Sequence, residues 1–447
     1  MEGAERLRFE AQLTDHFGLE VAQRVIGAIQ EEPSVSLRLN PMKPARIPDG
    51  SSQVPWHPHG YILPERPVFA LDPMFHAGAY YVQDSSSMIL SQIIKTLELP
   101  AHPLCLDACA APGGKSTIIL DTLQGQGFLL ANEIDPKRQR ILQENLMKWG
   151  HANYATTSVS IDRFHDTARF DLILVDAPCS GEGMFRKDAF AQKQWNEKLV
   201  AQCAYTQRSI LDDATPLLNE GGWLIYATCT MNPQENEVQI IRLLDSGDYE
   251  LATPSLPFKE HVVTIDHQGR SLGHYLLPGI STGEGLFIAV LRKVSSTPSL
   301  RIKKRKKQSS NGSANTVSLE ELEAFGIRTA VDDVGVAFGD AVHLVCQFEL
   351  IRGLSTPLRM IGQPAFTKKG KNLIPEHGLA MLELAPATIA LNHEEAIAYF
   401  RKEVLSLNAE IKHGWHVVSF EGRHLGWIKA MQGRTNNYYP GWLRLRM

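Results

Sequence analysis

The sequence has few cysteines and no apolar segment long enough to cross a membrane. Six cysteines are spread over 447 residues, and no two of them form a Cys-x-x-Cys pair. This scarcity argues against a disulfide framework and against a cysteine-ligated zinc site. The first residues, Met1-Glu-Gly-Ala-Glu5, lack the charged and apolar pattern of a signal peptide. We therefore expect a cytoplasmic protein with free thiols, no metal site and no membrane partner.

The sequence also lacks an overall excess of positive charge. Lys and Arg number 45 against 49 Asp and Glu, which gives a net charge of −4. If the partner is a nucleic acid, the positive charge must therefore be local. One local run, Arg-Ile-Lys-Lys-Arg-Lys-Lys over residues 301–307, lies in a segment rich in Ser, Asn and Gly. That segment, 294–316, is predicted to be a flexible linker whose basic run either contacts phosphates or only aids solubility.

The hydrophobic pattern divides the rest of the chain into three parts. Residues 4–30 have apolar positions at helical spacing and are predicted to form one helix, followed by a strand over 34–40. From 103 to 293, short apolar runs alternate with helical segments, which is typical of a doubly wound, mostly parallel α/β sheet. The end of the chain alternates aromatic and aliphatic residues and is predicted to be β-rich. The predicted boundaries are 1–77, 78–293, 294–316 for the linker, and 317–447.

Two cysteines follow two of the predicted strands. The apolar run Leu172–Val175 ends at Asp176-Ala-Pro-Cys179, and Cys229 follows the run 222–227. Because parallel strands end at the same edge of a sheet, both thiols are expected at the edge where ligands bind. A lone cysteine is more often a small buried apolar residue, but two at strand ends favour chemistry. The packing interpretation is kept for Cys105, Cys203 and Cys346.

A loop of small residues, Asp107-Ala-Cys-Ala-Ala-Pro-Gly-Gly-Lys115, joins the first strand of this region to its helix. Small residues let a ligand approach the backbone, and the helix N-terminus offers free N–H groups. The spacing does not match a phosphate-binding P-loop. The next strand ends in Asn132-Glu133, and an acid at that position typically binds ribose hydroxyls. Together these features predict a nucleoside-bearing cofactor, and adenosine linked to an amino acid would suit them.

These motifs resemble those of the RNA cytosine-5 methyltransferases that use S-adenosylmethionine. The resemblance rests on Asp-Ala-Pro-Cys-Ser-Gly at 176–181, Ala-Thr-Cys-Thr at 227–230, Ala-Pro-Gly-Gly-Lys at 111–115, and the closing motif at 283–293. Gly-Arg-x-Asn-Asn-Tyr-Tyr-Pro at 433–440 resembles the PUA-like region of the bacterial branch that modifies small-subunit ribosomal RNA. The resemblance implies a Rossmann-like methyltransferase domain, an N-terminal RNA-binding lobe and a small β-rich PUA-like C-terminal domain.

The resemblance also implies a role for each site residue. Cys229 is the expected nucleophile, and Cys179 is the second thiol, which assists proton removal and product release. Asp176 is expected to contact the cofactor or the cytosine amino group, and Lys187 to contact the substrate. The family usually has an Asp after the third strand, where this chain has Ser160, with Asp162 as a candidate replacement. The expected cofactor residues are Cys109, Ala110, Ala111, Pro112, Gly113, Gly114, Lys115, Glu133 (on the ribose), Arg138 (supporting Glu133) and Asp176.

Three functions remain open from the sequence. The first is methylation of cytosine C5 in RNA, with 16S ribosomal RNA, free or within the small subunit, as the expected partner. The second keeps this chemistry but acts on transfer RNA. The third is an RNA-binding assembly factor without activity, and the presence of Cys229, Cys179 and Asp176 argues against it. In the C-terminal region, aromatic residues interleaved with Arg and Lys suit RNA, but Trp415 and Trp427 are predicted to be core residues.

Overall fold

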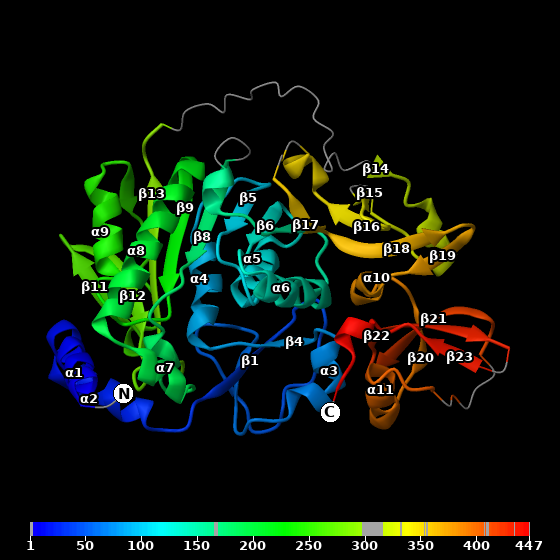
Figure 1. Cartoon of the computed structure of the whole chain (residues 1–447), viewed down its shortest axis with the longest axis horizontal. Helices are drawn as coiled ribbons and strands as arrows, with labels where there is room; N and C mark the ends of the chain where they lie inside the picture. Colours follow the sequence, from blue (N-terminus) through cyan, green and yellow to red (C-terminus); the bar gives the residue numbers. More distant parts are fainter. Residues whose placement is uncertain are drawn as a thin grey trace.

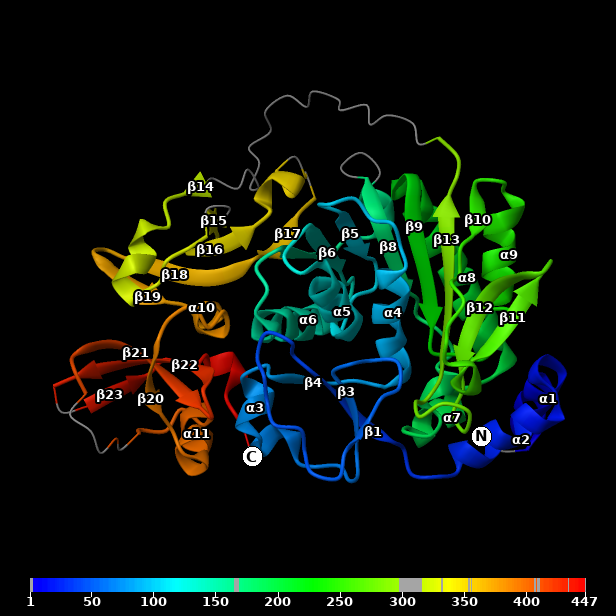
Figure 2. The same cartoon turned by 180° about the vertical axis from the view of Figure 1, so that it is seen from behind.

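A ten-stranded sheet lies at the centre of the molecule (Figures 1 and 2). The computed structural model describes residues 3–164, 169–296, 316–330, 333–352, 354, 356–405, 407, 411–432 and 434–446. Most of the predicted linker, including the basic run 301–307, lies outside the described residues. In sheet order the strands are β11 (Val263–His267), β12 (Arg270–Leu276), β13 (Leu286–Lys293), β9 (Leu218–Thr228), β8 (Phe170–Asp176), β5 (Leu104–Asp107), β6 (Phe128–Asn132), β7 (Tyr154–Thr157) and β17 (Leu358–Ile361), and β10 (Tyr249–Leu251) pairs with β13.

The centre of this sheet is parallel and its two ends are antiparallel. Strands β9, β8, β5, β6 and β7 pair in parallel. The remaining strands pair antiparallel, with β17 added to β7 at one end and β13 added to β9 at the other. The predicted doubly wound α/β core is therefore confirmed, and the full sheet is mixed.

Helices cover both faces of the sheet and create two apolar cores. Along β8, Leu172 and Leu174 belong to one core, whereas Ile173 and Val175 belong to the other. Burial on both faces explains why this strand is a continuous apolar run in the sequence. One face is covered by α4 (Leu90–Lys95), α5 (Gly114–Leu123) and α6 (Pro136–Trp149), and the other by α8 (Glu197–Ala214) and α9 (Glu237–Asp245).

The N-terminal segment forms two helices and a small sheet. The predicted single helix over 4–30 is wrong, because Gly18 adopts a φ of 81° that ends the first helix and starts the second. These helices, α1 (Ala4–Phe17) and α2 (Leu19–Ile29), pack in the same apolar core as α8 and α9. A four-stranded sheet follows, with β1 (Val35–Leu39), β2 (Ser52–Gln53), β3 (Gly60–Leu63) and β4 (Tyr80–Val82), next to α3 (Pro73–His76).

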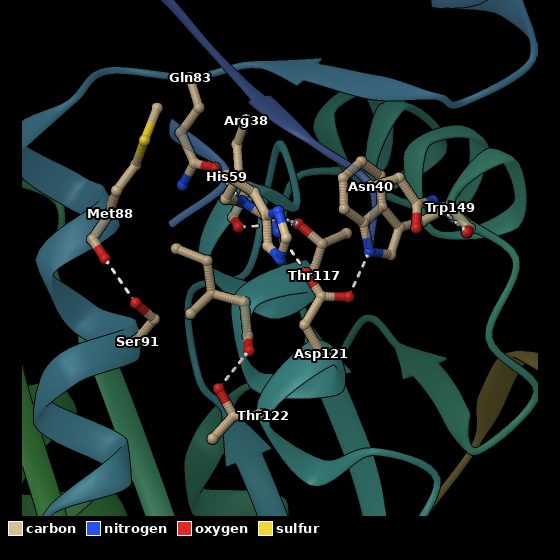
Figure 3. A network of polar contacts seen from close by, with 12 residues as sticks. Arg38, Asn40, His59, Gln83, Met88, Ser91, Thr117, Asp121, Thr122 and Trp149 are labelled. Atoms are coloured by element: carbon tan, nitrogen blue, oxygen red, sulfur yellow. Dashed lines mark hydrogen bonds and ion pairs between the residues drawn. The ribbon is translucent and has the colours of Figure 1, made fainter. Parts of the chain in front are cut away.

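A buried arginine joins this small sheet to the central one (Figure 3). Arg38 of β1 forms an ion pair with Asp121 of α5, and its guanidinium lies 4.5 Å from the centre of the Trp149 ring. It also donates to Gln83 Oε1 at 2.9 Å and to Thr117 Oγ1 at 2.5 Å. Trp149 Nε1 donates to Asp121 at 2.8 Å, so the carboxylate has partners on two sides. A buried charge is tolerated when it is paired and hydrogen-bonded in this way.

The C-terminal part contains two further sheets. The first is built from β14 (Thr316–Val317), β15 (Asp333–Phe338), β16 (Ala341–Cys346), β18 (Gln363–Lys369) and β19 (Asn372–Pro375). It is tied to the central sheet by β17 and by Gln363, whose Nε2 donates to the carbonyls of Met147 and His151 at 3.2 and 2.8 Å. The second consists of β20 (Ala387–Ala390), β21 (Gly414–Phe420), β22 (Arg423–Met431) and β23 (Arg434–Asn437), and the helices are α10 (His377–Met381) and α11 (His393–Phe400).

The two tryptophans predicted to be core residues differ in burial. Trp427 is buried, as predicted. Trp415 is only half-buried, with its ring 4.5 Å from that of Tyr438 and beneath the Lys429 ammonium.

Within the described part of the chain, no helix is long and apolar enough to span a bilayer.

Replacing Arg38 with methionine should lower the free energy of unfolding by about 3–5 kcal/mol, because Asp121 would lose its guanidinium partner while staying largely buried. Urea denaturation followed by tryptophan fluorescence measures the loss. Arg46→Met is the matched control, since Arg46 and Asp49 form an ion pair with both side chains exposed and should cost no more than about 1 kcal/mol. Equal losses in the two variants would contradict the stabilising role of Arg38.

Candidate active site

The two strand-end cysteines lie side by side. Asp176 of β8 pairs with Ala227 of β9 in parallel register, so the loops that follow the two strands leave the sheet together. The sulfur atoms of Cys179 and Cys229 are 3.2 Å apart. Two hydrogen bonds link the loops directly: Gly183 N–H donates to Cys229 O at 2.7 Å, and the hydroxyls of Ser180 and Thr230 are 3.0 Å apart. The expectation that strand order brings the two thiols together is confirmed.

The two thiols differ in acidity. A hydrogen bond from Cys179 lowers the pKa of Cys229 below the usual value for a thiol. The same contact, together with burial, raises the pKa of Cys179. The positive charge of Lys115 further favours the thiolate of Cys229. Cys229 is therefore the thiol of the pair that ionises more readily, with the S–H of Cys179 donated to its sulfur, and the thiolate is the nucleophilic form.

Asp176 and Lys115 form an ion pair beside the thiols. The Lys115 ammonium and an Asp176 carboxylate oxygen are 2.7 Å apart, and both side chains are partly exposed. Lys115 lies in the first turn of α5, whereas Asp176 ends β8. The pair thus joins the small-residue loop to the loop that carries Cys179.

The small-residue loop and the predicted ribose-binding acid are also adjacent. The amide of Ala110 donates to Asn132 O at 2.8 Å, which ties the loop to the end of β6. Glu133 is nearly buried and pairs with Arg138 Nη1 at 3.4 Å. Arg138 Nη2 also donates to Ala111 O at 2.7 Å. Arg138 therefore holds both the loop and the acid, as the resemblance implies for its contact with Glu133.

The remaining loop residues have the small size and backbone geometry that a close ligand requires. Ala110 and Ala111 are buried, Cys109 is half-buried, and Pro112 is exposed. Gly113 precedes α5 with a φ of 110°, a conformation that favours glycine, and Gly114 opens the helix. A carboxylate, free helical N–H groups and small side chains together suit a ribose with an attached amino acid. In the described residues no group of three or more His, Cys, Asp or Glu side chains could hold a metal ion.

The structure also shows the surroundings of three other predicted positions, Ser160, Asp162 and Lys187. Ser160 directly precedes a short 3-10 helix, η3 (Ile161–Phe164), that contains Asp162, and both side chains are exposed. Lys187 pairs with two acids, Asp84 at 3.5 Å and Glu284 at 3.7 Å. Since Asp84 follows β4 and Glu284 belongs to the closing motif, Lys187 connects three segments far apart in the sequence.

Two buried glutamates on the thiol loops, Glu182 and Glu235, were not predicted from the sequence. Glu182 accepts from Met231 N–H at 2.7 Å and from Trp195 Nε1 at 3.0 Å. Glu235 accepts from Ser180 N–H at 2.9 Å, and burial raises the pKa of Glu235 to about 7. The sequence pattern that could have indicated them is that each acid lies within six residues after a strand-end cysteine.

Comparison with known proteins agrees with this geometry. Three family models match consecutive parts of the chain: the N-terminal domain of 16S rRNA methyltransferase RsmF at 7–85, 16S rRNA methyltransferase RsmB/F at 94–292, and the methyltransferase RsmF PUA domain at 386–445. Ribosomal RNA small subunit methyltransferase F of Salmonella arizonae is 32% identical over 388 residues, which covers 81% of this chain and 78% of the relative. The chain belongs to the RsmB/F family of 16S rRNA methyltransferases. The Salmonella typhi protein of the same name is also 32% identical, with the same coverage.

Solved structures show the same fold for the RsmB/F-type core. NSun6 from Pyrococcus horikoshii, determined with SFG, aligns with a TM-score of 0.55 at 20% identity, covering 66% of this chain and 99% of that protein. A methyltransferase homologue from the same organism aligns with a TM-score of 0.53 at 28% identity, covering 65% of this chain and 96% of that protein. The Rossmann-like methyltransferase fold and the C-terminal PUA domain predicted from the sequence are confirmed. The cofactor of this RsmB/F enzyme is S-adenosylmethionine, also as predicted.

Removing the thiol of Cys179 should raise the pKa of Cys229, because the thiolate loses its hydrogen-bond donor. In Cys179→Ala, the rate of Cys229 alkylation by iodoacetamide should therefore reach its half-maximum at a higher pH than in the unmodified enzyme. Peptide mass spectrometry across a pH series measures this midpoint. Cys203→Ala on α8 is the control and should leave the midpoint unchanged; a midpoint that does not move in Cys179→Ala would refute the donor role.

Proposed function

We propose that this enzyme methylates C5 of cytosine in 16S ribosomal RNA through a covalent bond between Cys229 and C6 of the base. The observation that carries the proposal is the pair of thiols 3.2 Å apart at the carboxyl edge of β8 and β9, with the pKa of Cys229 lowered. C5 of cytosine is a weak nucleophile. Attack of a thiolate on C6 makes C5 enamine-like, so that it can accept a methyl group.

Each thiol has a separate task in this scheme. The Cys229 thiolate forms the S–C6 bond, and S-adenosylmethionine supplies the methyl group to C5. Cys179 then takes the proton from C5, and the S–C6 bond breaks to release Cys229 and the 5-methylcytosine. Before attack, the pKa of Cys179 is raised because its proton is shared with the Cys229 thiolate. Once Cys229 is bonded to C6, that acceptor is gone, and Cys179 gives its proton to solvent so that its thiolate can act as the base.

The polar residues around the thiols would hold the cofactor and the base. Asp176 is placed to contact the cofactor or to accept a hydrogen bond from the cytosine amino group, and it forms an ion pair with Lys115. Glu133 would bind the ribose hydroxyls, held by Arg138. The loop 109–115 would bind the amino-acid end of the cofactor at the start of α5.

Membership of the RsmB/F family favours ribosomal over transfer RNA as the substrate, and the thiol pair disfavours an inactive assembly factor. The PUA domain and the N-terminal domain supply additional surface for RNA. The cytoplasm, where ribosomal RNA is modified, is the proposed location. Bisulfite sequencing of ribosomal and transfer RNA from a strain that lacks the gene tests the substrate class directly. Loss of 5-methylcytosine from transfer RNA alone would overturn the assignment.

Replacing Cys229 with alanine should abolish methyl transfer, because the residue proposed to form the bond to C6 would have no sulfur. Transfer of labelled methyl groups to 16S ribosomal RNA measures this loss, and Cys203→Ala serves as the control. Full activity in Cys229→Ala would disprove the nucleophile assignment.

Replacing Cys179 with alanine should instead trap the enzyme on its RNA. The attack by Cys229 can still occur, although its raised pKa slows it, but the proton on C5 has no base to remove it. A protein–RNA adduct that migrates slowly on a denaturing gel is the expected product. If Cys179→Ala turns over normally and forms no adduct, its role in product release is wrong.

A further inference from the structure

The two loops that carry the thiols each contain a buried glutamate, and each glutamate reaches across to the other loop. Glu182 follows Cys179 by three residues and accepts a hydrogen bond from the backbone of Met231, two residues after Cys229. Glu235 follows Cys229 by six residues and accepts one from the backbone of Ser180, the residue directly after Cys179. Each loop thus supplies one carboxylate that accepts a hydrogen bond from the backbone of the other loop.

Glu235 holds the Cys179 loop from the side of α9. Its Oε2 accepts from Ser180 N–H at 2.9 Å and from Gln207 Nε2 of α8 at 2.8 Å. Gln207 Nε2 also donates to Pro178 O at 3.0 Å, on the other side of the cysteine. Because Tyr226 of β9 donates its hydroxyl to Glu235 O at 2.6 Å, the glutamate itself is fixed to the strand that leads to Cys229.

Glu182 holds the Cys229 loop from the side of α7 (Ala189–Gln194) and α1. Its Oε2 accepts from Met231 N–H at 2.7 Å, whereas its Oε1 accepts from Trp195 Nε1 at 3.0 Å and Gln12 Nε2 at 3.3 Å. Gln12 Oε1 in turn accepts from Asn232 Nδ2 at 2.7 Å. Gln12, in the middle of α1, therefore contacts both loops as well.

We propose that Glu182 and Glu235 are positioning residues that set the two thiols against each other, Glu182 by fixing the Cys229 loop and Glu235 by fixing the Cys179 loop. The backbone amides of Ser180 and Met231 would otherwise be buried without an acceptor, at a cost in free energy. Neither glutamate needs to touch the RNA or the cofactor. This inference rests on the proposed function, because it assigns each glutamate to one step of the covalent reaction.

Replacing the two glutamates should therefore impair different steps of the reaction. Loss of Glu235 loosens Cys179, the thiol needed to finish the reaction, so Glu235→Ala should accumulate the covalent RNA adduct as Cys179→Ala does. Loss of Glu182 loosens Cys229, the thiol needed to start it, so Glu182→Ala should form the adduct slowly and accumulate none. Since a buried backbone amide that loses its acceptor is costly, each change should lower kcat by roughly tenfold or more. The KM for S-adenosylmethionine should stay unchanged.

The conservative variants give a second, sharper distinction. In Glu235 a single oxygen, Oε2, makes both amide contacts, so the amide oxygen in Glu235→Gln can replace it and should restore near-normal adduct turnover. In Glu182 both oxygens accept hydrogen bonds. A glutamine has only one acceptor, so Glu182→Gln should lose part of the activity and not recover it.

The experiment uses the full chain, 16S ribosomal RNA transcribed in vitro and methyl-labelled S-adenosylmethionine, with adduct and methyl transfer followed in the same reactions. Glu237→Ala is the matched control. Glu237 is also a buried acid after Cys229, but it contacts Tyr275 and His16 and neither thiol loop. This variant should show normal adduct kinetics even where its thermal unfolding midpoint falls.

The inference is overturned if Glu182→Ala and Glu235→Ala show the same adduct level as Glu237→Ala, with activity that follows only the folded fraction. It is also overturned if Cys179→Ala traps the adduct and Glu235→Ala does not, a result that leaves the proposed function intact. Absence of any adduct in Cys179→Ala, with normal methyl transfer, would refute the covalent scheme itself, and the inference with it.

Discussion

The parallel register between β8 and β9 is the constraint on which the rest of the site depends. Pairing of Asp176 with Ala227 makes both strands end at the same level, so that each thiol leaves the sheet next to the other. A one-residue shift would turn every side chain of a strand to the opposite face and bury the wrong set of residues. The two apolar cores on either side of the sheet therefore fix the register, and through it the chemistry at the strand ends.

The ion pairs at the two ends of α5 differ in their exposure to solvent. At its N-terminus, Lys115 and Asp176 remain partly exposed, where an incoming ligand can compete for either charge. Near its C-terminus, Arg38 and Asp121 are withdrawn from water and surrounded by Gln83, Thr117 and Trp149. The second pair joins the small N-terminal sheet to α5, and the segment that follows this sheet carries Asp84, which pairs with Lys187. The ion pair at one end of the helix is thus structural, and the pair at the other end is accessible to a ligand.

The sequence was sufficient for the features set by local pattern. The apolar run of β8, the helix Pro136–Trp149 and the break at Asp176-Ala-Pro-Cys179 follow from periodicity and from proline. Contacts between segments far apart in the sequence could not be predicted. Nothing in the spacing of Glu182 or Gln12 shows that they meet at the Cys229 loop, because that depends on how α1 packs against the sheet. The split of the first helix at Gly18 was missed because apolar spacing continues across the glycine, whose positive φ interrupts the backbone.

Strand β17, at one end of the central sheet, has a consequence for synthesis of the chain. β17 covers the edge of β7, and Thr157 bonds to the carbonyl of Pro357, a residue 200 positions later. During translation from the N-terminus, all parallel strands of the sheet leave the ribosome well before this covering strand is made. For that interval the nascent protein carries an open strand edge, the kind of surface that pairs with other chains. The segment that contains β17 therefore protects a strand edge of the methyltransferase sheet, and it is synthesised after the strands that it protects.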